Sequence, residues 1–138
     1  MKKTFAGLLF LSVLISCGDS KNNEFGTVKG KLCYPSEMVP ALDLFFMNIE
    51  TKEVIVKHTK DNTQSYSYKD IPVGKYNVYA YEPREESEMG AGYTNYVVCG
   101  MKESCSDHKL TIVEVKPNQI TKNVDICDWY GAIIPKKK

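Results

Sequence analysis

Several stretches of this chain alternate between apolar and polar residues, and a period of two residues is the pattern of a half-buried β-strand. In residues 27–34, Val28 and Leu32 fall on one face while the lysines and Cys33 fall on the other. Residues 122–128 show the same alternation. No helical period of 3.6 residues is sustained anywhere for long. This pattern therefore predicts an all-β fold.

Further candidate strands lie between these two stretches and are separated by Gly, Pro and Asn. They are residues 42–49, 53–59, 65–69, 75–82, 95–99 and 110–116. Residues 42–49 are apolar on both faces, as in a central strand, and a polar turn at 50–52 predicts a hairpin. Pro117 and Asn118 predict the turn before the final strand. Short strands at this spacing favour an antiparallel Greek-key β-sandwich of about seven strands, which we place at residues 26–138.

One stretch carries a more specific signal, Tyr-Ser-Tyr-Lys-Asp-Ile-Pro-Val-Gly-Lys-Tyr-Asn-Val-Tyr-Ala-Tyr at residues 66–81. It resembles the transthyretin-like and carboxypeptidase-regulatory-like β-sandwich domains, and the resemblance covers roughly residues 26–130. In this pattern Pro72 fixes φ for a turn, and Gly74 permits the positive φ that closes it. The resemblance implies a fold and leaves the function open.

The first residues have the pattern of an export signal, with Lys2 and Lys3 before an apolar stretch at residues 5–15. That stretch is shorter than the roughly 20 residues a membrane-spanning helix needs. The sequence Leu-Ile-Ser-Cys at residues 14–17 resembles the lipobox of bacterial lipoproteins. The resemblance implies cleavage before Cys17 and attachment of diacylglycerol and a further acyl chain such as palmitate to Cys17.

This interpretation divides the chain into a lipoprotein signal peptide at residues 1–16, a polar and flexible tether at residues 17–25, and the sandwich domain. It also gives the chain a membrane partner through the lipid anchor, in the bacterial cell envelope. Gly18 follows the cysteine where an aspartate can signal retention at the inner membrane, so we favour the outer membrane.

The charge balance bears on the partners of the mature chain. The sequence has 18 basic and 17 acidic residues, and removal of Lys2 and Lys3 leaves the mature chain slightly acidic. Nucleic-acid-binding proteins carry a concentrated basic field. We therefore expect no nucleic acid partner, and we interpret the lysines at 136–138 as a solvated tail.

Five cysteines are present, and assigning Cys17 to the lipid leaves an even set in an exported chain, which indicates disulfides. Four cysteines allow three pairings. Cys99 and Cys105 close a small loop and are the natural local pair, which leaves Cys33 with Cys127. Cys33 and Cys127 each lie on the face of their strand opposite the apolar residues, and this shared placement suits a bridge between neighbouring strands.

Enzymatic and metal-binding functions have weak support in the sequence. The hydrolase relatives of the transthyretin-like fold end in Tyr-Arg-Gly-Ser, whereas the only arginine here is Arg84 in a polar loop. Dioxygenases with a related sandwich hold iron with two His and two Tyr. His58 could instead be a half-buried packing residue, and His108 could orient the Cys99–Cys105 loop. We expect no catalytic residues, metal or cofactor, with a metal-dependent enzyme using His58 or His108 and nearby tyrosines as the alternative.

A binding surface is the remaining candidate site. Four aromatic residues could form a patch for a glycan or an envelope protein: Tyr79, Tyr81, Trp129 and Tyr130. We favour the alternative that they cover the second face of the sandwich. The glutamates at residues 82–88 provide oxygen ligands of the kind calcium prefers, but their spacing fits a solvated loop better. Residues 82–94 and the aromatic end of the chain are the expected recognition elements of a non-catalytic accessory or binding module.

Overall fold

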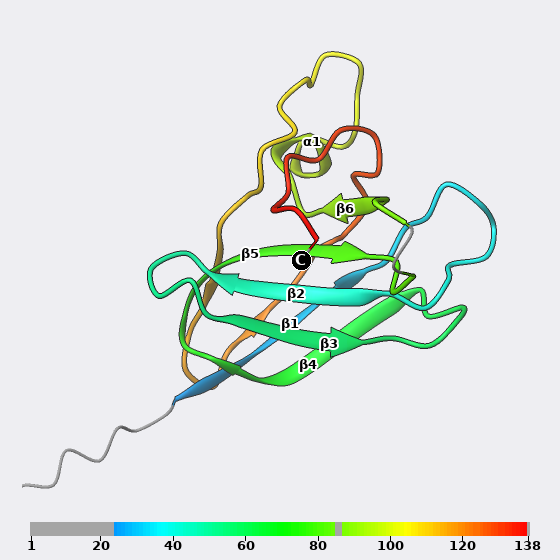
Figure 1. Cartoon of the computed structure of the whole chain (residues 1–138). Coiled ribbons are helices and arrows are strands. Elements are labelled where there is room, and N and C mark those ends of the chain that lie inside the picture. Colours follow the sequence, from blue (N-terminus) through cyan, green and yellow to red (C-terminus); the bar gives the residue numbers. More distant parts are fainter. Residues whose placement is uncertain (1–23, 85–86, 138) are drawn as a thin grey trace, which may run out of the picture.

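Two β-sheets face each other in the computed structural model, which describes residues 24–84 and 87–137 (Figure 1). The smaller sheet has the order β4 (Ser65–Pro72), β1 (Phe25–Lys31) and β8 (Ile120–Thr121). The larger sheet has the order β3 (Val54–His58), β2 (Asp43–Asn48), β5 (Gly74–Tyr81) and β6 (Gly90–Gly92), and β7 (Val113–Val115) also pairs with β5. The predicted all-β sandwich is confirmed.

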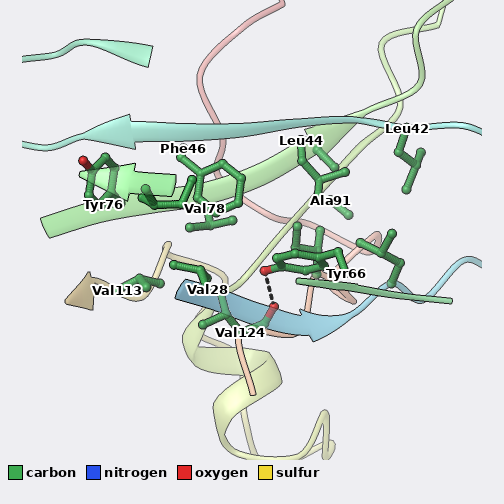
Figure 2. Close-up of a cluster of buried hydrophobic side chains, with 14 of the residues drawn as sticks. Val28, Leu42, Leu44, Phe46, Tyr66, Tyr76, Val78, Ala91, Val113 and Val124 are labelled. Carbon is green, nitrogen blue, oxygen red and sulfur yellow. Dashed lines mark hydrogen bonds between the residues drawn. The ribbon is translucent and has the colours of Figure 1, made fainter. Parts of the chain in front are cut away.

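The interior between the sheets follows the predicted alternation. Figure 2 shows Leu44 and Phe46 of β2 and Val78 of β5 above Val28 of β1. All four side chains are fully buried. Tyr66 adds a polar atom to this core, and its hydroxyl donates a 2.7 Å hydrogen bond to the carbonyl of Val124. Burying a hydroxyl is costly unless it finds such a partner, so Tyr66 connects the sheet to the returning C-terminal chain.

The expectation of purely antiparallel pairing is wrong for the last strand. β8 pairs with β1 in parallel, and the parallel arrangement continues in the bridge between Leu32 and Ile126. The other strand pairs are antiparallel. The chain turns at Pro117 and Asn118, as expected, and then runs along β1 in the same direction. Ladder pairing in residues 122–128 is limited to the bridges of Ile126 and Asp128.

One further expectation needs correction. Residues 95–99 do not form a strand but contain the one-turn helix α1 (Asn95–Val98), because Thr94 caps it by accepting a hydrogen bond from the amide of Val97. None of the residues of α1 is buried, so its valines have no core to pack against. The predicted turn from Pro72 to Gly74 leads from β4 in one sheet to β5 in the other, and Gly74 has the positive φ that was expected there.

The first 23 residues, with the predicted signal peptide, Cys17 and most of the tether, lie outside the described residues. The regular structure begins at Phe25, close to the predicted boundary. Within the described ranges, no helix is long and apolar enough to span a membrane.

Candidate functional site

Both predicted disulfides are present. Cys33 and Cys127 are bonded with a Cα–Cα distance of 4.6 Å, and Cys99 and Cys105 with a Cα–Cα distance of 6.5 Å. Leu32 and Ile126 pair with each other in a parallel β-bridge, and Cys33 and Cys127 are the next residues on the two segments. The first disulfide therefore connects neighbouring strands, as expected. It therefore fixes the position of the residues on either side of each cysteine.

Trp129 and Tyr34 meet beside the Cys33–Cys127 disulfide. Their rings lie edge to face with centroids 4.9 Å apart. The indole nitrogen of Trp129 donates a 2.6 Å hydrogen bond to the carbonyl of Cys33. The tryptophan is consequently held by an aromatic and a polar contact to the segment that follows β1, close to the disulfide of Cys127, and it orients Tyr34.

Glu82 lies at the centre of the candidate site, directly after β5. Its side chain is 2% exposed, and its carboxylate is held from two sides. The Tyr34 hydroxyl donates to Oε1, and the Arg84 guanidinium donates to Oε2 at 2.7 Å. Lys137 donates to the backbone carbonyl of Glu82 at 2.7 Å and also to that of Arg84. Two distant parts of the chain, at Tyr34 and Lys137, and the neighbouring Arg84 thus converge on Glu82.

The electrostatics of this group favour an ionised Glu82 beside a protonated Tyr34. The hydrogen bond from Tyr34 holds the pKa of Glu82 below its ordinary value, burial opposes this effect, and Arg84 adds to it. The same hydrogen bond raises the pKa of the Tyr34 hydroxyl, and burial raises it further. The pair is therefore a fixed donor and acceptor over a wide pH range.

A surface cavity of about 390 Å³ lies against this group. Its described lining consists of Tyr34, Glu82, Arg84, Ser87, Glu88 and Met89. The lining offers carboxylates, a guanidinium and a hydroxyl beside an aromatic ring and a thioether. Such a surface can bind hydroxyl and amide groups of a ligand at fixed positions while an apolar face packs on Tyr34 or Met89.

Two of the four residues considered for an aromatic patch are not available for one. Tyr79 and Tyr81 are each 5% exposed. Tyr79 stacks on Phe45 at a centroid distance of 5.2 Å, and the Tyr81 hydroxyl donates to the carbonyl of Pro135 at 2.6 Å. In Figure 1 the C-terminal segment lies beside β5 and β6, in agreement with this contact. These tyrosines cover the second face of the larger sheet, which was the favoured alternative.

The other two aromatic residues differ from each other. Trp129 is partly buried against the core, whereas Tyr130 is 72% exposed. The structure therefore brings Trp129 together with Tyr34, but it does not unite the four aromatic residues on one open surface.

The two histidines lie in separate places, each with one aspartate. His58 Nδ1 is 2.6 Å from Asp43, and the side chain of His58 is 74% exposed, so its interpretation as a half-buried packing residue is wrong. His108 Nδ1 is 2.7 Å from the buried Asp128, and its ring lies 4.6 Å from that of Tyr96. In residues 24–84 and 87–137, no group of three or more His, Cys, Asp or Glu is placed to hold a metal ion.

The role of His108 in orienting the Cys99–Cys105 loop stays a prediction, and the contacts of its side chain are with Asp128 and with Tyr96 of α1. Asp128 accepts from Thr94 at 2.8 Å as well as contacting His108, and Thr94 also caps α1. The buried carboxylate thereby joins the helix, the loop of His108 and the chain before Trp129.

Sequence analysis missed Glu82 and Tyr34 as a pair. The glutamate run at residues 82–88 suggested a solvated loop, which is wrong for Glu82. The alternation in β5 could have revealed the burial of Glu82. Tyr76, Val78 and Ala80 point inward at every second position, and Glu82 is the next residue in that series. The pairing with Tyr34 depends on a contact across 48 positions, and no local pattern predicts such a contact.

The comparisons with known proteins add no relatives to this description, since the chain matches no protein-family model, no curated protein and no solved structure.

Proposed function

We propose that this protein is a lipid-anchored binding module of the bacterial cell envelope that works without catalysis. The observation that supports a binding role is the cavity built on Glu82, where Tyr34, Glu82 and Arg84 hold one another in place before any ligand arrives. A preorganised site loses less conformational freedom on binding than a flexible one. The Cys33–Cys127 disulfide supports the same function because it holds Tyr34 and Trp129 beside the cavity.

The lining favours a polar ligand with many hydroxyl or amide groups, such as a glycan or a chain of an envelope protein. Glu88 and Ser87 line the cavity without being part of the sheets, and Met89 adds an apolar contact. The proposed anchor at Cys17 would keep this site at a membrane surface, with the outer membrane as the favoured location. The likeness to transthyretin-like domains stays a prediction.

The binding proposal can be tested with the full chain on an array of bacterial envelope glycans and by pull-down from envelope extracts with chemical crosslinking. Glu88→Gln and Ser87→Ala should each weaken capture of the identified ligand at least about fivefold, because the first removes a charged acceptor from the cavity and the second removes a hydroxyl. Trp129→Phe should weaken it as well by loosening Tyr34. The matched control is Glu50→Gln in the exposed β2–β3 turn. Equal capture by all variants would contradict the assignment of the site.

The rival function is a metal-dependent enzyme that uses His58 or His108 with nearby tyrosines. The observation in its favour is the buried Asp128, which orients His108 as outer carboxylates orient metal-binding histidines. Metal analysis of protein purified without chelator separates the two functions. Stoichiometric iron, copper or zinc that is lost in His108→Ala or His58→Ala would overturn the non-catalytic proposal.

A further inference from the structure

A basic groove lies on the outward side of the smaller sheet, away from the Glu82 cavity. Lys29, Lys31 and Lys122 line a hollow of about 410 Å³ together with the hydroxyl-bearing Ser65 and Ser67. The register explains this gathering, because the antiparallel pairing of β1 with β4 places Lys29 opposite Ser67 and Lys31 opposite Ser65. Val28 and Tyr66 are buried, so the alternate residues of both strands face outward.

The charges in the groove are unbalanced. Asp125 is the one carboxylate in its described lining, and one of its oxygens already accepts a 2.8 Å hydrogen bond from the backbone amide of Lys31. Within residues 24–84 and 87–137, none of the three lysine ammonium groups makes a hydrogen bond or an ion pair. Lys69 and Asp70 follow on β4 with opposite charges, so together they leave this excess of positive charge unchanged.

We propose that this groove docks the domain on an anionic bilayer, with the lysine ammonium groups and serine hydroxyls binding headgroup phosphates. Each lysine near an anionic membrane surface raises the association constant by a factor of about five, which corresponds to about 1 kcal/mol. The chain as a whole is nearly neutral, so the groove is a local excess of positive charge. A sheet face with lysines and small hydroxyl side chains suits a flat, charged surface.

The position of the groove relative to the proposed anchor supports a bilayer as the partner, and this inference rests on the lipid anchor of the proposed function. Cys17 precedes Phe25, the first residue of β1, by a tether that spans at most about 28 Å when extended. Lys29 and Lys31 lie on that same strand. The tether is therefore short enough to hold the groove beside the membrane, where its local concentration against the lipid surface is high.

The test uses the lipidated full chain in vesicles of phosphatidylglycerol and phosphatidylcholine and in vesicles of phosphatidylcholine alone. An amine-reactive reagent with mass-spectrometric detection measures the reactivity of each lysine. Lys29, Lys31 and Lys122 should react at least about fivefold more slowly on the anionic vesicles. The exposed lysines of the other sheet should react equally on both: Lys52, Lys60 and Lys75. At about 1 M salt the protection should disappear, since screening then acts over about 3 Å.

A second measurement uses the single tryptophan of the chain. Energy transfer from Trp129 to a dansyl lipid should differ between the two kinds of vesicle, and K29Q/K31Q/K122Q should remove the difference. The matched control K52Q/K60Q/K75Q changes the charge equally and should preserve it. Circular dichroism checks that both triple variants are folded.

Three outcomes separate the alternatives. Equal reactivity of the groove lysines on both vesicles, with the lipid present on Cys17, would overturn the docking proposal and leave the anchor intact. Equal protection in detergent by inorganic phosphate alone would also overturn it, because the groove would then be a site for a free ion. Absence of lipid on Cys17 would instead refute the anchor in the proposed function, and labelling with palmitate measures that separately.

Discussion

The hydroxyl of Tyr34 donates a hydrogen bond to the buried carboxylate of Glu82, from a position 48 residues earlier in the chain. This contact joins the end of β1 to the end of β5, and so connects the two sheets outside their apolar core. A carboxylate that is 2% exposed must be compensated by such donors, and Arg84 provides the second one.

Tyr34→Phe should therefore lower the free energy of unfolding by about 1.5–3 kcal/mol, the usual range for a hydrogen bond to a charged group. The change keeps the ring that packs on Trp129, so it tests the hydroxyl alone. Urea denaturation followed by tryptophan fluorescence measures the effect. Tyr130→Phe is the matched control, because that side chain is 72% exposed, and it should change stability by less than about 0.5 kcal/mol. Equal stability of Tyr34→Phe and wild type would show that the bond contributes nothing.

Acid should weaken the fold through Glu82. Its pKa in the folded chain lies below the ordinary value of 4.5, first because of the Tyr34 hydrogen bond, so the folded state binds this proton less readily than the unfolded state does. The stabilisation is fully present above pH 4.5 and is lost as the pH falls through the lower folded value. Stability measured between pH 6 and pH 2 should decline less steeply in Tyr34→Phe than in wild type. An identical slope in both proteins would contradict this account.

Alkali should unfold the protein through its buried tyrosines. Burial is the main reason that the pKa values of six hydroxyls lie above the ordinary 10.0: those of Tyr66, Tyr68, Tyr76, Tyr79, Tyr81 and Tyr93. Because the folded state then holds these protons more tightly, stability is fully present below pH 10 and falls as the pH rises further.

Tyrosinate absorption and far-ultraviolet circular dichroism, recorded over the same alkaline titration, test this prediction. Most of the tyrosinate signal should appear together with the loss of strand signal. In guanidinium chloride the same chain should titrate near the ordinary value. Complete tyrosine ionisation in a chain that keeps its native dichroism would refute the prediction.

The fold was predictable from local alternation where one face of a strand is buried. Val28 and Leu32 fall on one face of the alternating residues 27–34, and both point into the core. The short helix was missed because its two valines, Val97 and Val98, have a high β propensity and suggested a strand. The helix cap at Thr94 outweighs that preference. The parallel pairing of β8 with β1 depends on contacts far apart in the chain, and spacing alone contains no information about it.

The candidate site was less predictable than the fold. The disulfides were found because four cysteines allow few pairings, but the same cysteines did not reveal that Trp129 would donate to Cys33. Tyr81 donates to the carbonyl of Pro135, which lies in a segment without any strand pattern. Contacts of irregular segments with side chains have no period, and for that reason sequence patterns do not predict them.

Loss of the two disulfides should have unequal effects on stability. They close loops with sequence separations of 94 and 6 residues, for which chain-entropy estimates are about 4.7 and about 2 kcal/mol. Cys33→Ala/Cys127→Ala should therefore lower Tm more than Cys99→Ala/Cys105→Ala does. Calorimetry of both double variants under identical conditions measures the difference. A larger loss of Tm in the Cys99 and Cys105 variant would contradict the loop-closure argument.

Attachment of lipid at Cys17 remains a sequence-based prediction, and it determines where the site acts. Cells that express the wild-type chain with labelled palmitate should yield labelled protein in the membrane fraction, and Cys17→Ala should yield unlabelled protein. The reason is chemical, because the acyl chains require the cysteine sulfur, and each buried CH₂ contributes about 0.8 kcal/mol to membrane attachment. Asp19→Ala, two residues away, is the matched control and should keep the label. Palmitate incorporation that persists in Cys17→Ala would refute the anchor and, with it, the membrane partner proposed for the basic groove.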